Sequence, residues 1–183
     1  MTHEIRDATA ADADALRLRP TAAADRAFLY EMLHEANHWS LPPQASRPPL
    51  AETLAEGLVS RYVDGWGRPG DDGIVAEAGG VPVGACWLRL FTAACHGWGF
   101  VAPDVPELSI AVAPAWRGRG IGTRLLAAAV EQARAAGSLA VSLSVMPENT
   151  ARLLYERAGF RHVATDDGSW TMLLDLTQVP TAP

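Results

Sequence analysis

A short segment in the second half of the chain combines glycine and arginine in a spacing that suits an anion. Its glycines are Gly118, Gly120 and Gly122, and its arginines are Arg117, Arg119 and Arg124. Glycine has no side chain to block the backbone, so N–H groups at the start of the helix expected next can approach phosphate oxygens, and the helix dipole favours the negative charge. The segment therefore predicts a phosphate site, with a glycine-rich helix entry and solvated arginines as the alternative. Thr123 stands where the dinucleotide fingerprint GxGxxG needs its last glycine, which disfavours a Rossmann nicotinamide site.

A second pattern is typical of zinc hydrolases. His34, Glu35 and His38 form HExxH on an expected helix, a spacing that puts both imidazoles on one face beside a glutamate base. No glycine-spaced third histidine follows, and both histidines lie off the apolar stripe of that helix. We therefore favour a solvated or substrate-facing surface and predict no metal site. Because Glu52 or Glu56 could supply a third ligand, a zinc hydrolase stays the less favoured alternative.

Two blocks of the chain resemble the GNAT superfamily of N-acetyltransferases. Residues 117–122 match its Arg/Gln-x-x-Gly-x-Gly/Ala signature, and the usual strand precedes them. Residues 149–160 are similar to its Asn-x-x-Ala/Ser-x-x-x-Tyr-x-x-x-Gly-Phe region, with Ala151 beside the small-residue place rather than on it. The resemblance implies an α/β (α+β) fold, with a GNAT-like mixed, mostly antiparallel central sheet of about six to seven strands flanked by about four helices.

The resemblance also implies acetyl-CoA as the acetyl-donor cosubstrate. Its diphosphate would lie on the backbone amides of Arg119 to Thr123, and its pantetheine arm would run beside Ile110 to Val112 as an added strand. Amides of that arm can hydrogen-bond to strand main chain where neighbouring strands diverge. Asn149 contacts the cofactor or substrate in this family, and a helix N-cap is its alternative role. The expected cofactor-binding residues are Ile110, Ala111, Val112, Arg117, Gly118, Arg119, Gly120, Ile121, Gly122, Thr123 and Asn149.

The implied reaction is direct transfer of the acetyl group to a primary amine of a small molecule or peptide. Tyr155 matches the family tyrosine whose hydroxyl donates to the departing thiolate. With a reference pKa near 10, a tyrosine stays protonated at neutral pH and can serve as that acid. The alternative for Tyr155 is a helix aromatic packed with Phe160. A non-catalytic acyl-CoA sensor with the same fold is the alternative to an enzyme.

Glu107 is our candidate for the general base. An alkylamine is charged at pH 7, and forming its free base costs roughly 4–5 kcal/mol, so a base is useful. Glu107 starts an expected strand beside the proposed thioester, and its side chain shares a face with Ser109 and Ala111, opposite the core-like residues of that strand. The alternatives are a solvated carboxylate or a water relay, and Glu31, His96 or Ser109 could replace it as the base.

The elements that must position these residues follow from hydrophobic periodicity and turn signals. A helix that Thr21 can cap carries apolar residues from Phe28 to Ala36, and the prolines at 48–49 precede a helix expected over 50–63. A glycine-rich connection, 65–73, and a hairpin around Gly79-Gly80 follow. Further helices are expected over 121–136 and 149–158, and strands over 16–19, 74–77, 82–88, 107–112, 139–145, 160–164 and 169–176.

Composition narrows the class of partner. Acidic residues number 21 and basic ones 15, for a net charge of −6, which argues against nucleic acid or an anionic membrane. Every basic residue is arginine, which excludes the lysine chemistry of P-loop nucleotide hydrolases and pyridoxal enzymes. Some aromatic residues could wall an acceptor pocket, although we favour ordinary core. They are Trp39, Tyr62, Trp66, Trp87, Phe91, Trp98 and Phe100.

Length and cysteine content indicate one domain. With 183 residues, we expect a flexible extension over 1–14, a single acetyltransferase domain over 15–177 and a flexible tail over 178–183. Cys86 and Cys95 form no CxxC pair and are expected to be idle thiols. Because the chain shows no signal-peptide pattern and no long apolar run, we expect a cytoplasmic protein. Exposed sheet edges are compatible with a homodimer.

Overall fold

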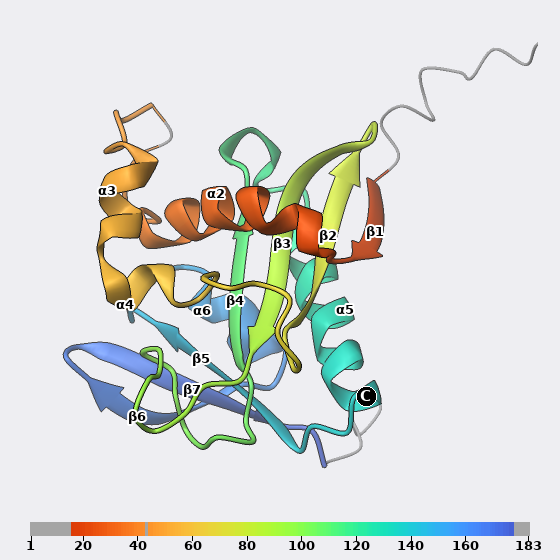
Figure 1. Cartoon of the computed structure of the whole chain (residues 1–183), viewed down its shortest axis with the longest axis vertical. Helices are drawn as coiled ribbons and strands as arrows, with labels where there is room; N and C mark the ends of the chain where they lie inside the picture. The colour runs from red at the N-terminus through yellow and green to blue at the C-terminus, as the bar shows by residue number, and fades with distance from the viewer. Residues whose placement is uncertain (1–15, 43, 178–183) are drawn as a thin grey trace, which may run out of the picture.

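The computed structural model of the chain describes residues 16–42 and 44–177. Its centre is a sheet with the strand order β1-β2-β3-β4-β5-β7-β6 (Figure 1). All neighbours are antiparallel except β4 and β5, which are parallel. The strands are β1 Leu16–Pro20, β2 Asp72–Ala78, β3 Val81–Arg89, β4 Glu107–Val112, β5 Ala140–Val145, β6 Arg161–Asp166 and β7 Ser169–Asp175. The predicted mixed, mostly antiparallel sheet of up to seven strands is confirmed.

Helices cover both faces of the sheet. Figure 1 shows α2 crossing one face and α5 packed on the other. The helices are α2 Arg26–Asn37, α3 Leu50–Ala55, α4 Gly57–Ser60, α5 Ile121–Ala135 and α6 Arg152–Arg157, with 3-10 turns η1 Ala23–Asp25 and η2 Pro114–Trp116. Alternation along β3 separates two cores, because Cys86 and Leu88 pack in the cluster with α5 whereas Ala85 and Trp87 pack in the cluster with α2.

Two predicted helix features are wrong. The single helix expected over 50–63 is broken at Glu56, whose ψ of 97° is extended, and the helix restarts at Gly57. Thr21 does not cap the first helix, because the N-cap position is Ala22 for η1 and Asp25 for α2. The carboxylate of Asp25 accepts the Ala22 N–H instead, and Arg19 holds that carboxylate with two further bonds.

The remaining elements agree with their predicted places to within a few residues. The hairpin turns at Gly79-Gly80, where both glycines have positive φ. The helix expected over 149–158 is shorter, because only Arg152–Arg157 is helical and the residues before it form a turn. The predicted extension over 1–14 and tail over 178–183 lie outside the described residues.

The sheet opens between β4 and β5. Among the described residues, the register joins these strands only at Glu107 and Ser142, with one further bond from Ser142 N–H to Pro106 O at 3.0 Å. Beyond that pair, β4 continues against β3 on its other edge, where Ile110 lies opposite Cys86 and Val112 opposite Gly84. The edge of β4 that faces β5 is therefore left without a strand partner along the second half of the strand.

Candidate active site

A cavity of about 710 Å³ lies at the opening between β4 and β5, a volume typical of a small-molecule site. β4 lines it along its whole length, from Glu107 to Val112. Residues of the turn before α5 and residues of α6, Tyr155 among them, also line it. Residues that the sequence analysis placed in the cofactor and catalytic sets are thus brought to one cavity.

The backbone along the open edge of β4 offers hydrogen-bonding groups. Ala113 N–H donates to Val83 O at 2.9 Å, so the N–H groups of alternate residues of β4 point to β3. The groups of Ile110 and Val112 therefore point the other way, toward the gap. This is the arrangement that an extended chain with its own amides needs in order to add to a sheet edge.

The turn that leads into α5 presents free backbone donors. Gly118 and Gly120 have φ of 73° and 74°, a region that other residues rarely adopt, so the turn itself requires glycine. The first helical bond runs from Arg124 N–H to Gly120 O at 3.2 Å. The N–H groups of Ile121, Gly122 and Thr123 therefore have no acceptor within the helix and can bind an anion.

The arginines of the motif do not point into this site as a group. Arg117 pairs with Glu35 at 2.8 Å and donates to Val112 O at 3.0 Å. The guanidinium of Arg119 lies over the Trp116 ring, 4.7 Å from its centroid, and Arg119 does not line the cavity. Arg124 donates to Leu16 O at 3.3 Å. The predicted anion site is thus built mainly from backbone, and every other predicted cofactor residue lines the cavity.

Tyr155 is buried on α6 and contributes to the cavity wall. Burial, with a smaller contribution from Cys86, raises the pKa of its hydroxyl far above 10, so the group stays protonated at neutral pH. Its ring also packs against Phe160, with centroids 6.0 Å apart. Both roles considered for Tyr155, an acid and a packed aromatic, are compatible with this position.

Asn149 also lines the cavity. Its side-chain oxygen accepts the Ala151 N–H at 2.9 Å and so closes the turn that leads into α6. The N-cap of α6 is Ala151, which has no side-chain capping bond, so the N-cap alternative for Asn149 is wrong.

Glu107 is buried at the closed end of the gap, with 2% of its surface exposed. Tyr62 donates its hydroxyl to Glu107 Oε1, and Gly99 N–H donates to the same oxygen at 2.7 Å. Burial raises the pKa of Glu107 to about 7, although Tyr62, Gly99 and the nearby His96 act in the opposite direction. The alternative of a solvated carboxylate is therefore wrong. The side of β4 that carries Glu107 and Ala111 also faces a hydrophobic core, because Ala111 packs in the cluster with α2. Both sides of the strand therefore face buried residues.

Comparison with known proteins identifies this arrangement. The acetyltransferase (GNAT) family model matches residues 28–160. The chain belongs to this family. The predicted resemblance and the predicted class of enzyme, an acyltransferase, are confirmed.

Individual relatives of this GNAT chain are more distant. The mycothiol acetyltransferase of Sanguibacter keddieii is 31% identical over 124 residues, which are 67% of this chain and 38% of that protein. This chain therefore spans well under half the length of that relative.

Solved structures share the fold. The Salmonella typhimurium protein yncA, solved with its cofactor acetyl-CoA, is 23% identical with a TM-score of 0.64 over 92% of this chain and 98% of that one. The paia N-acetyltransferase of Thermoplasma acidophilum, in complex with coenzyme A, is 19% identical with a TM-score of 0.63 over 88% and 99% of the two chains. Both of these GNAT structures hold acetyl-CoA or coenzyme A, the cofactor class expected for this chain from its sequence. Within residues 16–42 and 44–177, no helix is long and apolar enough to cross a bilayer.

The aromatic residues of this GNAT domain divide between pocket and core. Trp39, Tyr62 and Trp98 line the cavity, and the rings of Tyr62 and Trp98 are stacked with centroids 5.8 Å apart. Trp87 and Phe91 are buried in the core with α2. The other aromatics of the predicted set, Trp66 and Phe100, also pack with that core.

The other residues considered as bases have different places. Ser109 lines the main cavity, whereas Glu31 lines a separate small cavity beside α2. His96 stacks on Phe100 with centroids 4.9 Å apart, and its Nδ1 lies 2.8 Å from Gly97 O. Glu107 is the candidate that combines burial, a raised pKa and a place in the wall of the main cavity.

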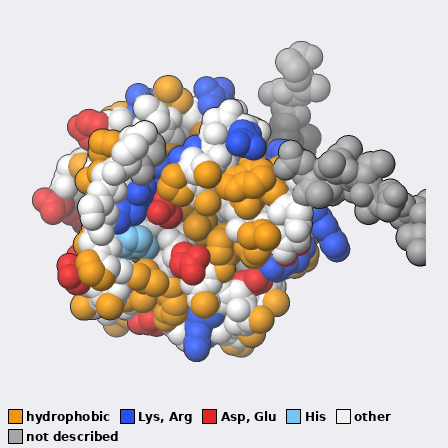
Figure 2. Space-filling view, turned by 90° about the horizontal axis from the view of Figure 1, so that it is seen from above, with side chains coloured by type: hydrophobic (Ala, Val, Ile, Leu, Met, Phe, Trp, Pro, Cys, Tyr) orange, Lys and Arg blue, Asp and Glu red, His pale blue; other side chains and the backbone are white. Residues whose placement is uncertain are grey.

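The HExxH residues have partners that do not suit a zinc hydrolase. Glu35 pairs with Arg47 at 3.1 Å and with Arg117 at 2.8 Å, so its carboxylate is neutralised rather than available as a base. His34 Nδ1 contacts Thr53 Oγ1 at 2.8 Å, and His38 Nδ1 contacts His34 O at 2.9 Å. Figure 2 shows the face of the molecule seen from above, where hydrophobic, basic and acidic side chains are interspersed with a small patch of histidine surface.

Proposed function

We propose that this chain transfers the acetyl group of acetyl-CoA directly to a primary amine of a small molecule or peptide. The observation that carries the proposal is the single cavity that joins the open edge of β4, the free amides before α5, and the side chains of Glu107 and Tyr155. The proposed donor site and the two side chains proposed to move protons would thus share one cavity.

The chain offers a cradle that fits the donor. Backbone groups of Ile110 and Val112 would pair with the amides of the pantetheine arm, and amides from Arg119 to Thr123 would bind the diphosphate. Gly118 and Gly120 support this fit, because a Cβ at either position would meet nothing within 4 Å, so the turn leaves open space above the backbone. Bound in this way, the donor would supply an activated thioester at a fixed height along β4.

Glu107 would act as the general base. A pKa of about 7 leaves a large share of this carboxyl ionised at neutral pH, where it can still hold a proton taken from an amine. Glu107 would take one proton from the substrate ammonium, so that the neutral nitrogen can form the carbon–nitrogen bond. This removes part of the cost of about 4–5 kcal/mol that the neutral amine otherwise carries at pH 7. The second proton leaves the nitrogen after that bond has formed and replaces the one that Tyr155 gives to the sulfur.

Tyr155 would act as the acid. As the carbon–sulfur bond breaks, its hydroxyl would give a proton to the departing sulfur, and coenzyme A would leave as a neutral thiol. Burial supports this role, because it keeps the hydroxyl protonated over the whole physiological range.

The direct test is thiol release from acetyl-CoA in the presence of a panel of amines, which includes polyamines, aminoglycosides, amino acids and peptide N-termini. We expect amine-dependent release with at least one class and an acetylated product by mass spectrometry. Tight binding of acetyl-CoA without turnover of any amine would instead support a sensor of acyl-CoA.

A further inference from the structure

The hydroxyl of Tyr62 connects the candidate base to the segment that covers it. It accepts the Trp98 N–H at 2.7 Å and donates to Glu107 Oε1. Gly99 N–H binds the same carboxylate oxygen. The other oxygen, Oε2, is buried and has no hydrogen-bond partner among the described residues. Two donors thus fix one side of the carboxylate and leave the other side unbonded.

The covering segment is shaped around this pair. A Cβ at Gly97 would come within 2.6 Å of Glu107 Oε2 and would also overlap the hydroxyl of Tyr62. A Cβ at Gly99 would lie 2.9 Å from Glu107 Oε1 and 2.5 Å from the backbone of Leu143. Only glycine fits at these two places, so the backbone approaches the carboxylate closely enough to donate to it directly.

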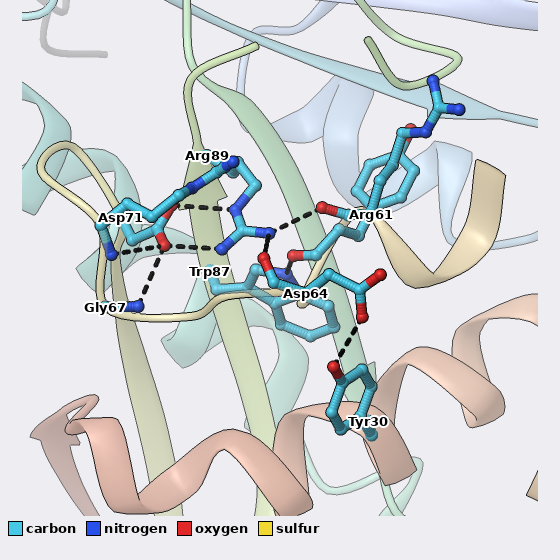
Figure 3. A network of polar contacts seen from close by, with 9 residues as sticks. Tyr30, Arg61, Asp64, Gly67, Asp71, Trp87 and Arg89 are labelled. Carbon is cyan, nitrogen blue, oxygen red and sulfur yellow. Dashed lines mark hydrogen bonds and ion pairs between the residues drawn. The ribbon is translucent and has the colours of Figure 1, made fainter. Parts of the chain in front are cut away.

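Buried side chains of β3 hold the backbone that carries Tyr62. Arg89 is fully buried, and its Nη1 donates to Arg61 O at 2.6 Å and to Asp64 O at 2.9 Å, the carbonyls one residue before and two residues after Tyr62 (Figure 3). Trp87 Nε1 donates to Tyr62 O at 3.1 Å. Asp71 completes the network with two bonds to Arg89, of 2.9 and 2.6 Å. The backbone around Tyr62 is therefore held by the side chains of Arg89 and Trp87, both of them fully buried.

We propose that Tyr62 is a positioning residue for acetyl transfer: its hydroxyl, together with Gly99 N–H, fixes Oε1 of Glu107 and leaves Oε2 as the oxygen that takes the amine proton. This inference rests on the base role of Glu107 in the proposed function. The Arg89–Asp71 pair extends the same support to the backbone of Tyr62. Tyr62 itself moves no proton to or from the substrate.

The groups around Glu107 determine in which direction a substitution of Tyr62 shifts the pKa of this carboxyl. Tyr62 comes from the connection after α4 and His96 from the segment after β3, and both lower the pKa of Glu107. Arg89 lies opposite Glu107 in the β3–β4 register, but its guanidinium is engaged by Asp71. Ser142, the register partner on β5, is neutral. Loss of the Tyr62 hydroxyl therefore raises the pKa of Glu107, and a stronger donor at this position lowers it.

The test is the pH profile of acetyl transfer by the full chain carrying Tyr62→Phe, assayed with the amine found by the panel. We expect kcat to fall about tenfold, a fraction of what a positioned base contributes. The acid limb of the profile should move to higher pH, while the KM for acetyl-CoA stays unchanged. Tyr30→Phe is the matched control, because Tyr30 also donates to a carboxylate, Asp64 Oδ1 at 2.6 Å, without contact with Glu107. Its profile should not move.

A second substitution guards against a folding defect. Fluorotyrosine at position 62 keeps the ring and strengthens the hydroxyl as a donor, so the acid limb should move to lower pH. Opposite shifts for the two variants are not expected from a loss of packing alone. An unmoved limb in the fluorotyrosine protein, with Tyr62→Phe unfolded or unchanged, would overturn the positioning role.

A double-mutant cycle separates this inference from the proposed function. In a Glu107→Gln background, Tyr62→Phe should reduce kcat by less than about twofold, because its partner is already inactive. If the double variant instead lost kcat by the product of the two single-variant losses, the positioning role would be overturned and the base role would stand. Full activity of Glu107→Gln would overturn the base itself, and with it both proposals.

Discussion

Glu107 on β4 lies opposite Ser142 on β5, and among the described residues this is the single register pair that joins the two strands. They lie where the two strands begin to separate, so the carboxylate of Glu107 is at the closed end of the gap. The N–H groups of Ile110 and Val112 follow along its open side. The proposed donor cradle and the candidate base therefore both depend on the same break in the sheet.

The turn before α5 should control donor affinity. Gly120→Glu places a carboxylate at the helix N-terminus, where it occupies and repels the phosphate site, so affinity for acetyl-CoA should fall about tenfold or more. Gly137→Glu is the control, because Gly137 also has positive φ and open space but lies at the other end of α5. Calorimetry should show loss with the first variant and near-native affinity with the second. Equal affinities would exclude this turn as the phosphate site.

Tyr155→Phe should slow the chemical step without weakening donor binding. Removing the acid forces coenzyme A to leave as a thiolate, and we expect the rate of thiol release to fall about 10²-fold. The dissociation constant of acetyl-CoA should be unchanged, because the ring and its packing against Phe160 are kept. An unaltered rate in single-turnover assays would leave Tyr155 as a packed aromatic only.

Activity should fall on acidification through neutral pH. Glu107 must be ionised to accept a proton, and burial raises its pKa to about 7. On the acid limb of the pH profile, kcat/KM should therefore decline below pH 7 and reach a plateau above it. Glu107→Gln should lower the rate and abolish this limb. A wild-type limb near pH 4.5, the ordinary range of a glutamate, would show that a different group titrates.

The buried Arg89–Asp71 pair should be important for stability. Arg89→Met leaves the Asp71 carboxylate and two backbone carbonyls buried without their donor, which should cost about 3–5 kcal/mol of unfolding free energy. Arg68→Met is the control, since Arg68 is partly exposed and lies 3.6 Å from the same carboxylate; its cost should be under about 1 kcal/mol. Urea denaturation measures both, and comparable costs would contradict the importance given to the buried pair.

The parts of the site that could be predicted from the sequence are the local ones. Glycines with positive φ, a helix start and the preceding strand are all properties of one continuous segment, so residues 107–124 could be interpreted without the rest of the fold.

The helix break at Glu56 could not be predicted in the same way. The leucine spacing across 50–58 suits one helix, and the local signal against it, Gly57, is weak.

The support of Glu107 could not be predicted in this way. Tyr62 lies 45 positions before Glu107, and only strand pairing and the placement of the segment after α4 bring the two together. The signal available in the sequence was the pair Gly97 and Gly99 around Trp98, which marks a close backbone approach without naming its partner. Burial of Glu107 depends on the same long-range contacts.

The most direct test of the proposed function is a crystal structure of the chain with coenzyme A. We expect the diphosphate within hydrogen-bond distance of the amides that precede and begin α5, the pantetheine amides paired with Ile110 and Val112, and the sulfur beside Tyr155 in reach of an amine at Glu107. A turn left empty by the ligand, or a coenzyme bound away from the open edge of β4, would contradict it.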